Sequence, residues 1–250
     1  MIFKKEVWMT PYQMMRTLHI YVPDEAQSSK QRYPVFYMYD GHNLFDDAEA
    51  TYGKSWGLKE YLDGQKEKRI IVGIECNHEG NQRIVEYCPY TFYDHRLGTI
   101  VGSGKQMMEW VVQELKPLID QELPTLPDRN HTWIGGSSMG GLMALYSITY
   151  HNAVFSRAAC LSPFLGPVRK QIAQDCQLPL QTDTYIYLSW GSNESRSKRG
   201  FTYMSKVNIE IANLLYQQDI HLRLNLVPGG QHCEASWEKE IPTFFQFFKQ

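Results

Sequence analysis

The sequence predicts an α/β fold with a mostly parallel central sheet flanked by helices, and three observations support this prediction. Apolar runs of strand length alternate with helix-like segments along most of the 250 residues. Most of these runs are unbroken, as expected for strands that are covered on both faces. Hydrophobic residues make up 43% of the chain, which is enough to bury a sizeable core. We therefore expect one domain over residues 1–250.

The predicted strands are short apolar runs spread along the whole chain. They cover residues 17–22, 35–39, 70–74, 132–134, 158–161, 185–188 and 222–227. The first run ends at Pro23, and a polar turn is predicted after it through Ser28, Ser29 and Lys30.

Three helices are predicted between and after these strands. Apolar residues over 107–119 follow helical spacing and should face the core, although Pro117 should kink or divide this helix. A second helix is predicted over 207–217, and a last one spans roughly 235–248 with its aromatic side chains buried. The stretch 77–103 is the longest irregular segment, and we expect it to form a pocket wall or a partial lid.

Charge and cysteine content narrow the class of protein. The formal net charge is −2, and no long run of one sign occurs, which argues against nucleic acid or an anionic membrane surface as partner. No apolar run resembles a signal peptide or approaches the length of a membrane span. The five cysteines include no C-x-x-C pair, which argues against a disulfide framework and a zinc site. We expect a cytoplasmic protein with reduced thiols.

Residues 136–140, Gly-Ser-Ser-Met-Gly, fit the Gly-x-Ser-x-Gly nucleophile elbow. This pentapeptide lies between an apolar run and a helix-like run, which is the strand-turn-helix context that the elbow requires. The small residues two positions before and after Ser138 let the chain turn tightly and expose the serine. The alternative is a glycine-rich turn with a capping serine.

A serine nucleophile needs a histidine as general base and a carboxylate that orients the histidine. Glu194 and His232 each follow a late predicted strand, which places both at the carboxyl edge of the sheet, where active sites of open α/β sheets form. The chain order of Ser138, Glu194 and His232 is that of the α/β-hydrolase fold. Asp183 competes for the acid role but precedes its strand. The alternatives are a solvated loop charge at Glu194 and an ordinary loop histidine at His232.

Ester hydrolysis also needs hydrogen-bond donors for the oxyanion. The backbone N–H of Met139, directly after the nucleophile, is the first candidate. The second is the backbone N–H of His42, in the loop after the strand at 35–39, where Gly41 would let the backbone approach the substrate. The acids near this loop form no spaced His/Asp/Glu set, so no metal site is expected. Phe45, Trp56 and Phe164 are candidates for pocket walls, with plain core positions as the alternative.

Several pieces of the chain share motifs with one known family. They are residues 37–45, 86–89, 135–142, 162–164, 191–194 and 229–232, with Trp237 five residues further on. Through these motifs most of the chain resembles the Putative esterase family of α/β-hydrolases, which includes esterase D, enterochelin esterases, feruloyl esterase domains and mycolyl transferases. By position, the resemblance implies the following roles: Ser138 as nucleophile, His232 as base, Glu194 as acid, and the backbone of His42 and Met139 as oxyanion hole.

One departure bears on the substrate. Esterase D has a His-Gly-Gly type loop where this chain has Asp-Gly-His-Asn at residues 40–43, so formylglutathione is not the favoured substrate. The resemblance therefore implies small, soluble esters with a short-chain or aromatic, hydroxycinnamoyl-type acyl group.

Together these observations predict a serine carboxylesterase that works through an acyl-enzyme on Ser138 and requires no cofactor. Its expected partner is a small-molecule ester, and a homo-oligomer is an open alternative to a monomer. Two other functions stay open: an acyltransferase that uses the same triad, and a catalytically silent binding protein with a hydrolase fold. The sequence alone does not specify the acyl or alcohol group.

Overall fold

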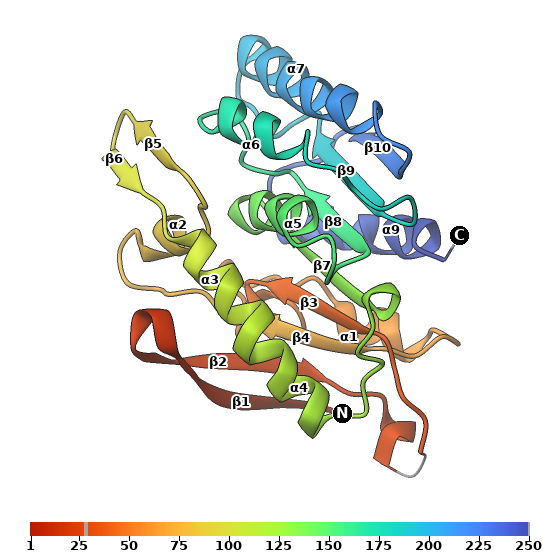
Figure 1. Cartoon of the computed structure of the whole chain (residues 1–250). Helices are drawn as coiled ribbons and strands as arrows, with labels where there is room; N and C mark the ends of the chain where they lie inside the picture. The colour runs from red at the N-terminus through yellow and green to blue at the C-terminus, as the bar shows by residue number, and fades with distance from the viewer. Residues whose placement is uncertain (28–29, 250) are drawn as a thin grey trace.

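The computed structural model describes residues 1–27 and 30–249, and its framework is an eight-stranded sheet (Figure 1). The strands follow the spatial order β1-β2-β4-β3-β7-β8-β9-β10. Their bounds are β1 (Ile2–Met9), β2 (Met14–Tyr21), β3 (Val35–Tyr39), β4 (Ile70–Ile74), β7 (Thr132–Ser137), β8 (Arg157–Leu161), β9 (Tyr185–Gly191) and β10 (His221–Val227). Pairing is antiparallel within β1-β2-β4 and parallel from β4 to β10. The prediction of a mostly parallel sheet is confirmed.

Every predicted strand is present, and the largest omission is β1. This edge strand contains Lys4, Lys5 and Glu6, so the unbroken apolar run that marked the other strands is absent from it. It forms because all eight of its residues pair with β2. Ser28 and Ser29, in the predicted turn after β2, lie outside the described residues.

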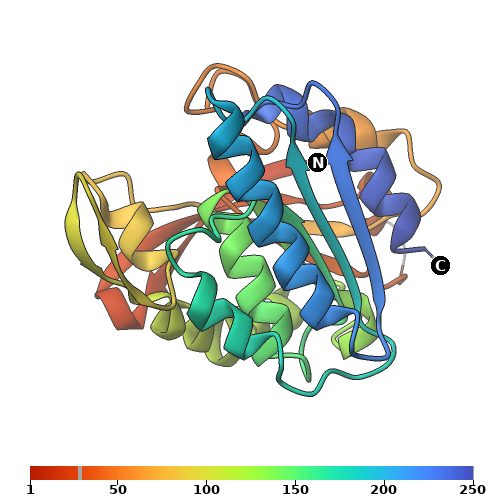
Figure 2. The ribbon, with the colours of Figure 1, turned by 90° about the horizontal axis from the view of Figure 1, so that it is seen from above.

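Helices cover both faces of the sheet, as predicted (Figures 1 and 2). One face carries α3 (Gly104–Trp110), α4 (Lys116–Glu122), α5 (Met139–Tyr150), α6 (Arg169–Asp175) and α7 (Lys198–Leu215). The other face carries α1 (Leu58–Asp63), α8 (Glu234–Trp237) and α9 (Ile241–Phe247). Along β3, Val35 and Tyr37 pack into the core under α3 to α7, and Phe36 packs into the core under α1, α8 and α9. This is the side-chain alternation of a strand.

The predicted helices exist with corrected bounds. The helix predicted over 107–119 is divided, since a π-helical turn at Val111–Leu115 separates α3 from α4 immediately before Pro117, which has no N–H to donate. The helix predicted over 207–217 begins earlier, because Ser197 caps α7 by accepting a hydrogen bond from the N–H of Gly200 at 3.0 Å. The predicted last helix is likewise divided, with Pro242 in the first turn of α9.

The stretch 77–103 is more regular than the sequence predicts. It contains α2 (Gln82–Glu86) and a hairpin of β5 (Thr91–Asp94) and β6 (Gly98–Val101). Its two strands have only four residues each, so their pattern is too short to stand out in the sequence. The hairpin projects from one side of the molecule, in yellow in Figure 2.

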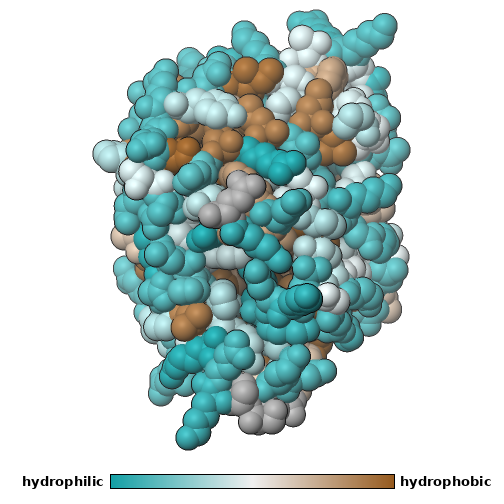
Figure 3. Space-filling view, turned by 90° about the vertical axis from the view of Figure 1, so that its right-hand side faces the viewer, coloured by the Kyte–Doolittle hydropathy of each residue, from teal (hydrophilic) through white to brown (hydrophobic). Residues whose placement is uncertain are grey.

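The surface shown in Figure 3 is mostly hydrophilic, with hydrophobic side chains gathered in its upper half. Of the helices formed by residues 1–27 and 30–249, none is both long and apolar enough to cross a membrane.

Candidate active site

Ser138 lies in a sharp turn between β7 and α5. Its backbone has φ 57° and ψ −118°, a conformation that side-chain-bearing residues rarely adopt. The flanking glycines are needed for space: a Cβ at Gly136 would lie 3.0 Å from the Gly140 carbonyl carbon, and one at Gly140 would lie 2.8 Å from Cβ of Tyr39. The turn therefore has the geometry that the pentapeptide predicts for a nucleophile elbow.

The N-terminus of α5 begins directly after this serine. Met139 is the first residue of this twelve-residue helix, so its N–H has no partner within the helix. The aligned peptide dipoles give this end of the helix a partial positive charge. A negatively charged oxygen beside Ser138 would be stabilised here.

Glu194 and His232 are brought together by the loops after β9 and β10. Nδ1 of His232 and Oε2 of Glu194 are 2.9 Å apart. Two glycines allow this approach, since a Cβ at Gly191 would lie 2.2 Å from the carbonyl oxygen of Gly230. The N–H of Asn193 then donates to that same oxygen at 2.8 Å. The contact leaves Nε2 as the free nitrogen of the imidazole.

The Glu194 carboxylate is nearly covered, with 3% of its side chain exposed. Burial by itself raises the pKa of this carboxyl, but hydrogen bonds from His232, Ser162 and the Gly191 N–H outweigh burial and hold the pKa below its ordinary value. The carboxylate therefore stays ionised and can orient the histidine and stabilise its protonated form.

Ser162 and Trp237 support this carboxylate, a role that the sequence reasoning did not assign to them. The Ser162 hydroxyl donates to Oε1 of Glu194 at 2.6 Å and accepts from Nε1 of Trp237 at 2.8 Å. The Trp237 ring also packs edge-on against His232, with centroids 5.2 Å apart. Both residues lie within the family motifs, and this is the signal by which the sequence could have identified them.

Ser138 and His232 line one cavity of about 360 Å³. Within the described parts of the chain, no hydrogen bond joins their side chains, and such contacts often tighten only when substrate binds. Asp183, the competing acid, precedes β9 at the other end of the sheet and pairs with Arg129 at 2.5 Å. The structure thus brings together Ser138, Glu194 and His232 and leaves Asp183 apart.

The loop after β3 forms a single 3₁₀ turn, Gly41–Asn43, whose hydrogen bonds are donated by Asn43 and Leu44. The turn does not use the N–H of His42, and His42 lines the Ser138 cavity. A Cβ at Gly41 would lie 2.6 Å from the Gly73 carbonyl, so packing against β4 also requires glycine at this position.

An ion pair holds this loop in place. Asp40 has a left-handed backbone, φ 59°, and its carboxylate accepts two hydrogen bonds of 2.7 Å from the guanidinium of Arg83. The Tyr87 hydroxyl accepts from the Asp40 N–H at 3.2 Å and donates to the carbonyl of Ile74. Burial raises the pKa of Tyr87 well above its ordinary value, so this hydroxyl stays protonated. The sequence did not single out Arg83, because its partner lies 43 residues away.

The three candidate pocket residues lie in different places. Phe164 lines a smaller cavity of about 200 Å³ that also contacts Glu194 and His232. Phe45 instead borders a separate cavity of about 790 Å³. Trp56 is buried in the core, with its ring centroid 6.0 Å from that of Trp237. A plain core position was the alternative to a pocket wall for this residue. The predicted wall from stretch 77–103 contributes Asn77, His78, Gly80 and Arg83 to the Ser138 cavity.

A parallel sheet with a serine elbow and an acid and a histidine at its carboxyl edge defines a serine hydrolase of the α/β class. Residues 12–248 match the family model described as Putative esterase. The chain belongs to this family and is an ester hydrolase.

Individual relatives are distant in sequence and similar in structure. The uncharacterized protein YbbA of Bacillus subtilis (strain 168) is 21% identical over 90% of this chain and 89% of its own. An IroE-like serine hydrolase from Shewanella oneidensis superposes with a TM-score of 0.80 at 21% identity, over 100% of this chain and 80% of that one. A ferulic acid esterase gives a TM-score of 0.71 at 14% identity, over 99% and 97% of the two chains. These structural likenesses show the fold.

Proposed function

We propose that this ester hydrolase is a serine carboxylesterase that acts on small carboxylic esters through an acyl-enzyme on Ser138. The observation that carries the proposal is the Glu194–His232 pair. Glu194 contacts Nδ1 of His232, and the His232 ring lines the same cavity as Ser138. A general base and a nucleophile at one cavity, with the base oriented by a buried carboxylate, are the parts that acyl transfer requires.

In the first half of the reaction, the Ser138 oxygen attacks the ester carbonyl carbon and His232 accepts the hydroxyl proton at Nε2. The oxyanion receives hydrogen bonds from the N–H groups of Met139 and His42. The C–O bond to the alcohol then breaks, and His232 returns the proton to the leaving alcohol. In the second half, His232 takes a proton from water, whose oxygen attacks the acyl carbon. The bond from that carbon to Oγ of Ser138 then breaks, and His232 returns the proton to Oγ, which releases the carboxylic acid and restores Ser138. No cofactor takes part in this proposed sequence.

The two cavities beside His232 support a small substrate with one apolar group. The cavity of about 200 Å³ is lined by Phe164, Leu165, Met204 and Val207 among others, a surface suited to a short acyl chain or an aromatic ring. The larger Ser138 cavity is more polar, with Asp40, His78 and Arg83 in its wall. A hydroxycinnamoyl-type ester matches this arrangement. The name of the ferulic acid esterase of similar fold indicates that it acts on an ester of this kind.

Replacing the nucleophile tests the proposal. We expect Ser138→Ala to lower kcat on a p-nitrophenyl ester by about 10⁴-fold or more with the fold intact. It should also abolish labelling by a fluorophosphonate probe, whereas Ser137→Ala, one residue earlier, should keep the labelling. Retained turnover in Ser138→Ala would contradict the proposal.

The other two functions have their own tests. Ester products formed on addition of alcohol acceptors would favour an acyltransferase, and an unreactive Ser138 in the wild type would favour a binding protein. The cytoplasmic location, the single domain and the oligomeric state stay predictions from the sequence.

A further inference from the structure

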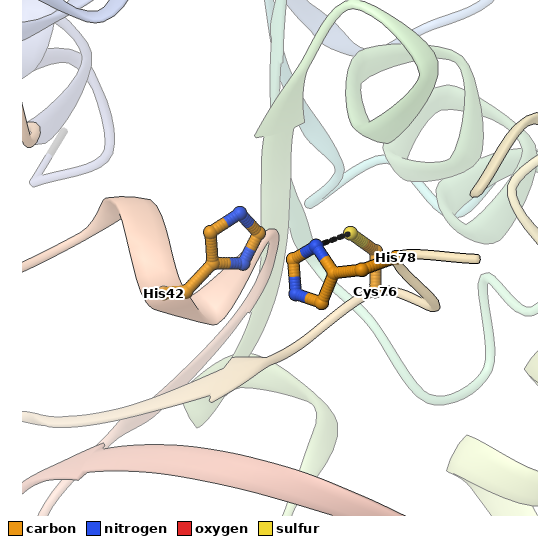
Figure 4. A group of neighbouring side chains, drawn as sticks. All are labelled: His42, Cys76 and His78. Atoms are coloured by element: carbon orange, nitrogen blue, oxygen red, sulfur yellow. Dashed lines mark hydrogen bonds between the residues drawn. The ribbon is translucent and has the colours of Figure 1, made fainter. Parts of the chain in front are cut away.

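Three side chains in the wall of the Ser138 cavity bring their metal-binding atoms together. His42 comes from the 3₁₀ turn after β3, and Cys76 and His78 come from the segment after β4. One ring nitrogen of each histidine and the Cys76 sulfur all lie within 4.8 Å of one another. Figure 4 shows the imidazoles of His42 and His78 next to each other in an edge-to-face arrangement, with the Cys76 thiol beside His78. None of these three residues belongs to the Glu194–His232 pair.

One nitrogen of this group is buried without a partner. His42 is 7% exposed, and its Nδ1 has no hydrogen-bond partner among residues 1–27 and 30–249. Its other nitrogen, Nε2, lies 2.9 Å from the Thr51 hydroxyl. In Figure 4 a ring nitrogen of His42 is turned toward His78. A buried polar atom left unpaired is destabilising, so a ligand bound to this nitrogen would be favourable.

The outer contact of His78 is that of a metal-binding histidine. Nε2 of His78 lies 2.9 Å from Oε1 of Glu75, whose other oxygen lies 2.7 Å from Nε2 of His19. This arrangement directs Nδ1 of His78 toward the Cys76 sulfur, 3.8 Å away. A carboxylate on the far nitrogen fixes the tautomer and orientation of a ligating histidine.

We propose that Nδ1 of His42, Sγ of Cys76 and Nδ1 of His78 bind a zinc ion, with a fourth position open to the Ser138 cavity. A mixed set of imidazole and thiolate ligands with one open position suits Zn²⁺. On binding, the Cys76 thiol releases its proton to solvent and ligates as thiolate. Small side-chain rotations would bring the three atoms to zinc–ligand distances of about 2.0–2.3 Å.

A bound ion would also affect catalysis, an extension that rests on the proposed function. His42, Cys76 and His78 line the cavity that holds Ser138 and His232, so the ion would occupy space beside the nucleophile. It would also restrain the turn whose His42 N–H is proposed as an oxyanion donor. Zinc is therefore an inhibitor of ester hydrolysis in this proposal.

Cobalt titration of the full chain tests binding without using activity. Co²⁺ replaces zinc, and its bond to a thiolate gives a near-ultraviolet absorption band. We expect this band to saturate at one equivalent in the wild type and to disappear when zinc is added. Cys76→Ser should remove the band. His78→Ala, at an exposed side chain, should keep the fold and weaken zinc binding by at least about 100-fold, because losing even an outer-shell partner costs about 10–100-fold.

Matched controls separate this site from other thiols and histidines. Cys233→Ser removes a partly exposed cysteine, whereas the other four cysteines of the described residues are buried, and His95→Ala removes an exposed histidine on the β5-β6 hairpin. Both should bind cobalt like the wild type. Ser138→Ala should also bind cobalt normally while inactive, which keeps metal binding distinct from the proposed catalysis.

The absence of a thiolate band in the wild type at one equivalent would overturn the proposal. Equal zinc affinity in the wild type, Cys76→Ser and His78→Ala would do the same. For the catalytic extension, zinc should inhibit the wild type and fail to inhibit His78→Ala at the same concentration. Inhibition that persists unchanged in His78→Ala would place the inhibiting ion elsewhere, such as on His232.

Discussion

The Ser138 cavity has two walls that are built in different ways. Its C-terminal wall consists of Ser137, Ser138, His232, Glu234 and Trp237, and its N-terminal wall consists of residues between Asp40 and Arg83. In the C-terminal wall, Ser138 directly follows β7 and His232 lies in the loop after β10, both strands of the parallel part of the sheet. In the N-terminal wall, positions are held by pairs between distant segments, such as Asp40 with Arg83 and His42 with His78.

This difference shows which kind of functional residue a sequence reveals. A residue at the end of a parallel strand is placed by the sheet, so chain order and strand position locate it. A residue held by a distant side chain is placed only when the whole fold has formed. The proposed chemistry of the C-terminal wall follows from sequence motifs, whereas the ion pair and the His42–Cys76–His78 group of the N-terminal wall do not.

The largest effect should come from Glu194, the acid that pairs with His232 of the C-terminal wall. Because Glu194 orients His232 and stabilises its protonated form, we expect Glu194→Gln to lower kcat by about 10³–10⁴-fold with a smaller change in KM. The loss should be no larger than that of Ser138→Ala. Steady-state kinetics on a p-nitrophenyl ester measure it. An unchanged kcat would move the acid role to another carboxylate and break the contrast between the walls.

An intermediate effect should come from the ion pair of the N-terminal wall. Arg83→Met leaves the Asp40 carboxylate, 6% exposed, without its partner. Since Arg83 itself is partly exposed, we expect a loss of about 2 kcal/mol in the free energy of unfolding. Urea denaturation measures this loss.

Two further variants make the Arg83 result specific. Arg199→Met, at an exposed position of α7, should leave the stability within about 0.5 kcal/mol. Adding Asp40→Asn to Arg83→Met should recover part of the loss, because it removes the unpaired charge. No recovery would show that the ion pair does not act as one unit.

The smallest effect concerns pH and Glu194. Its pKa in the folded protein lies below the ordinary value of 4.5, so the fold favours the ionised form. This contribution to stability is fully present above 4.5 and is lost as pH falls through the lowered folded pKa. Thermal unfolding of the wild type and Glu194→Gln should therefore differ most near neutral pH and converge in acid. A gap in Tm that stays constant down to pH 3 would contradict this.

Much of the fold was predictable because buried parallel strands leave unbroken apolar runs. The runs at 35–39 and 70–74 match β3 and β4 residue for residue. β1 was missed because its charged residues interrupt the pattern, and the β5-β6 hairpin was missed because four-residue strands leave too little pattern. The predicted helix bounds were wrong where a proline divides a helix, and where Ser197 caps α7 earlier in the chain than the apolar pattern begins.

By itself, the sequence determined the sheet class, the elbow at Ser138 and the positions of Glu194 and His232 after their strands, because each of these depends on neighbouring residues and chain order. The tertiary structure alone decided that Ser162 and Trp237 support the carboxylate, that Arg83 holds Asp40, and that Trp56 lies in the core. It also decided the meeting of His42 with Cys76 and His78, since the chain passes through α1 and β4 between His42 and Cys76. Contacts of this kind depend on how distant segments pack, and no local pattern encodes them.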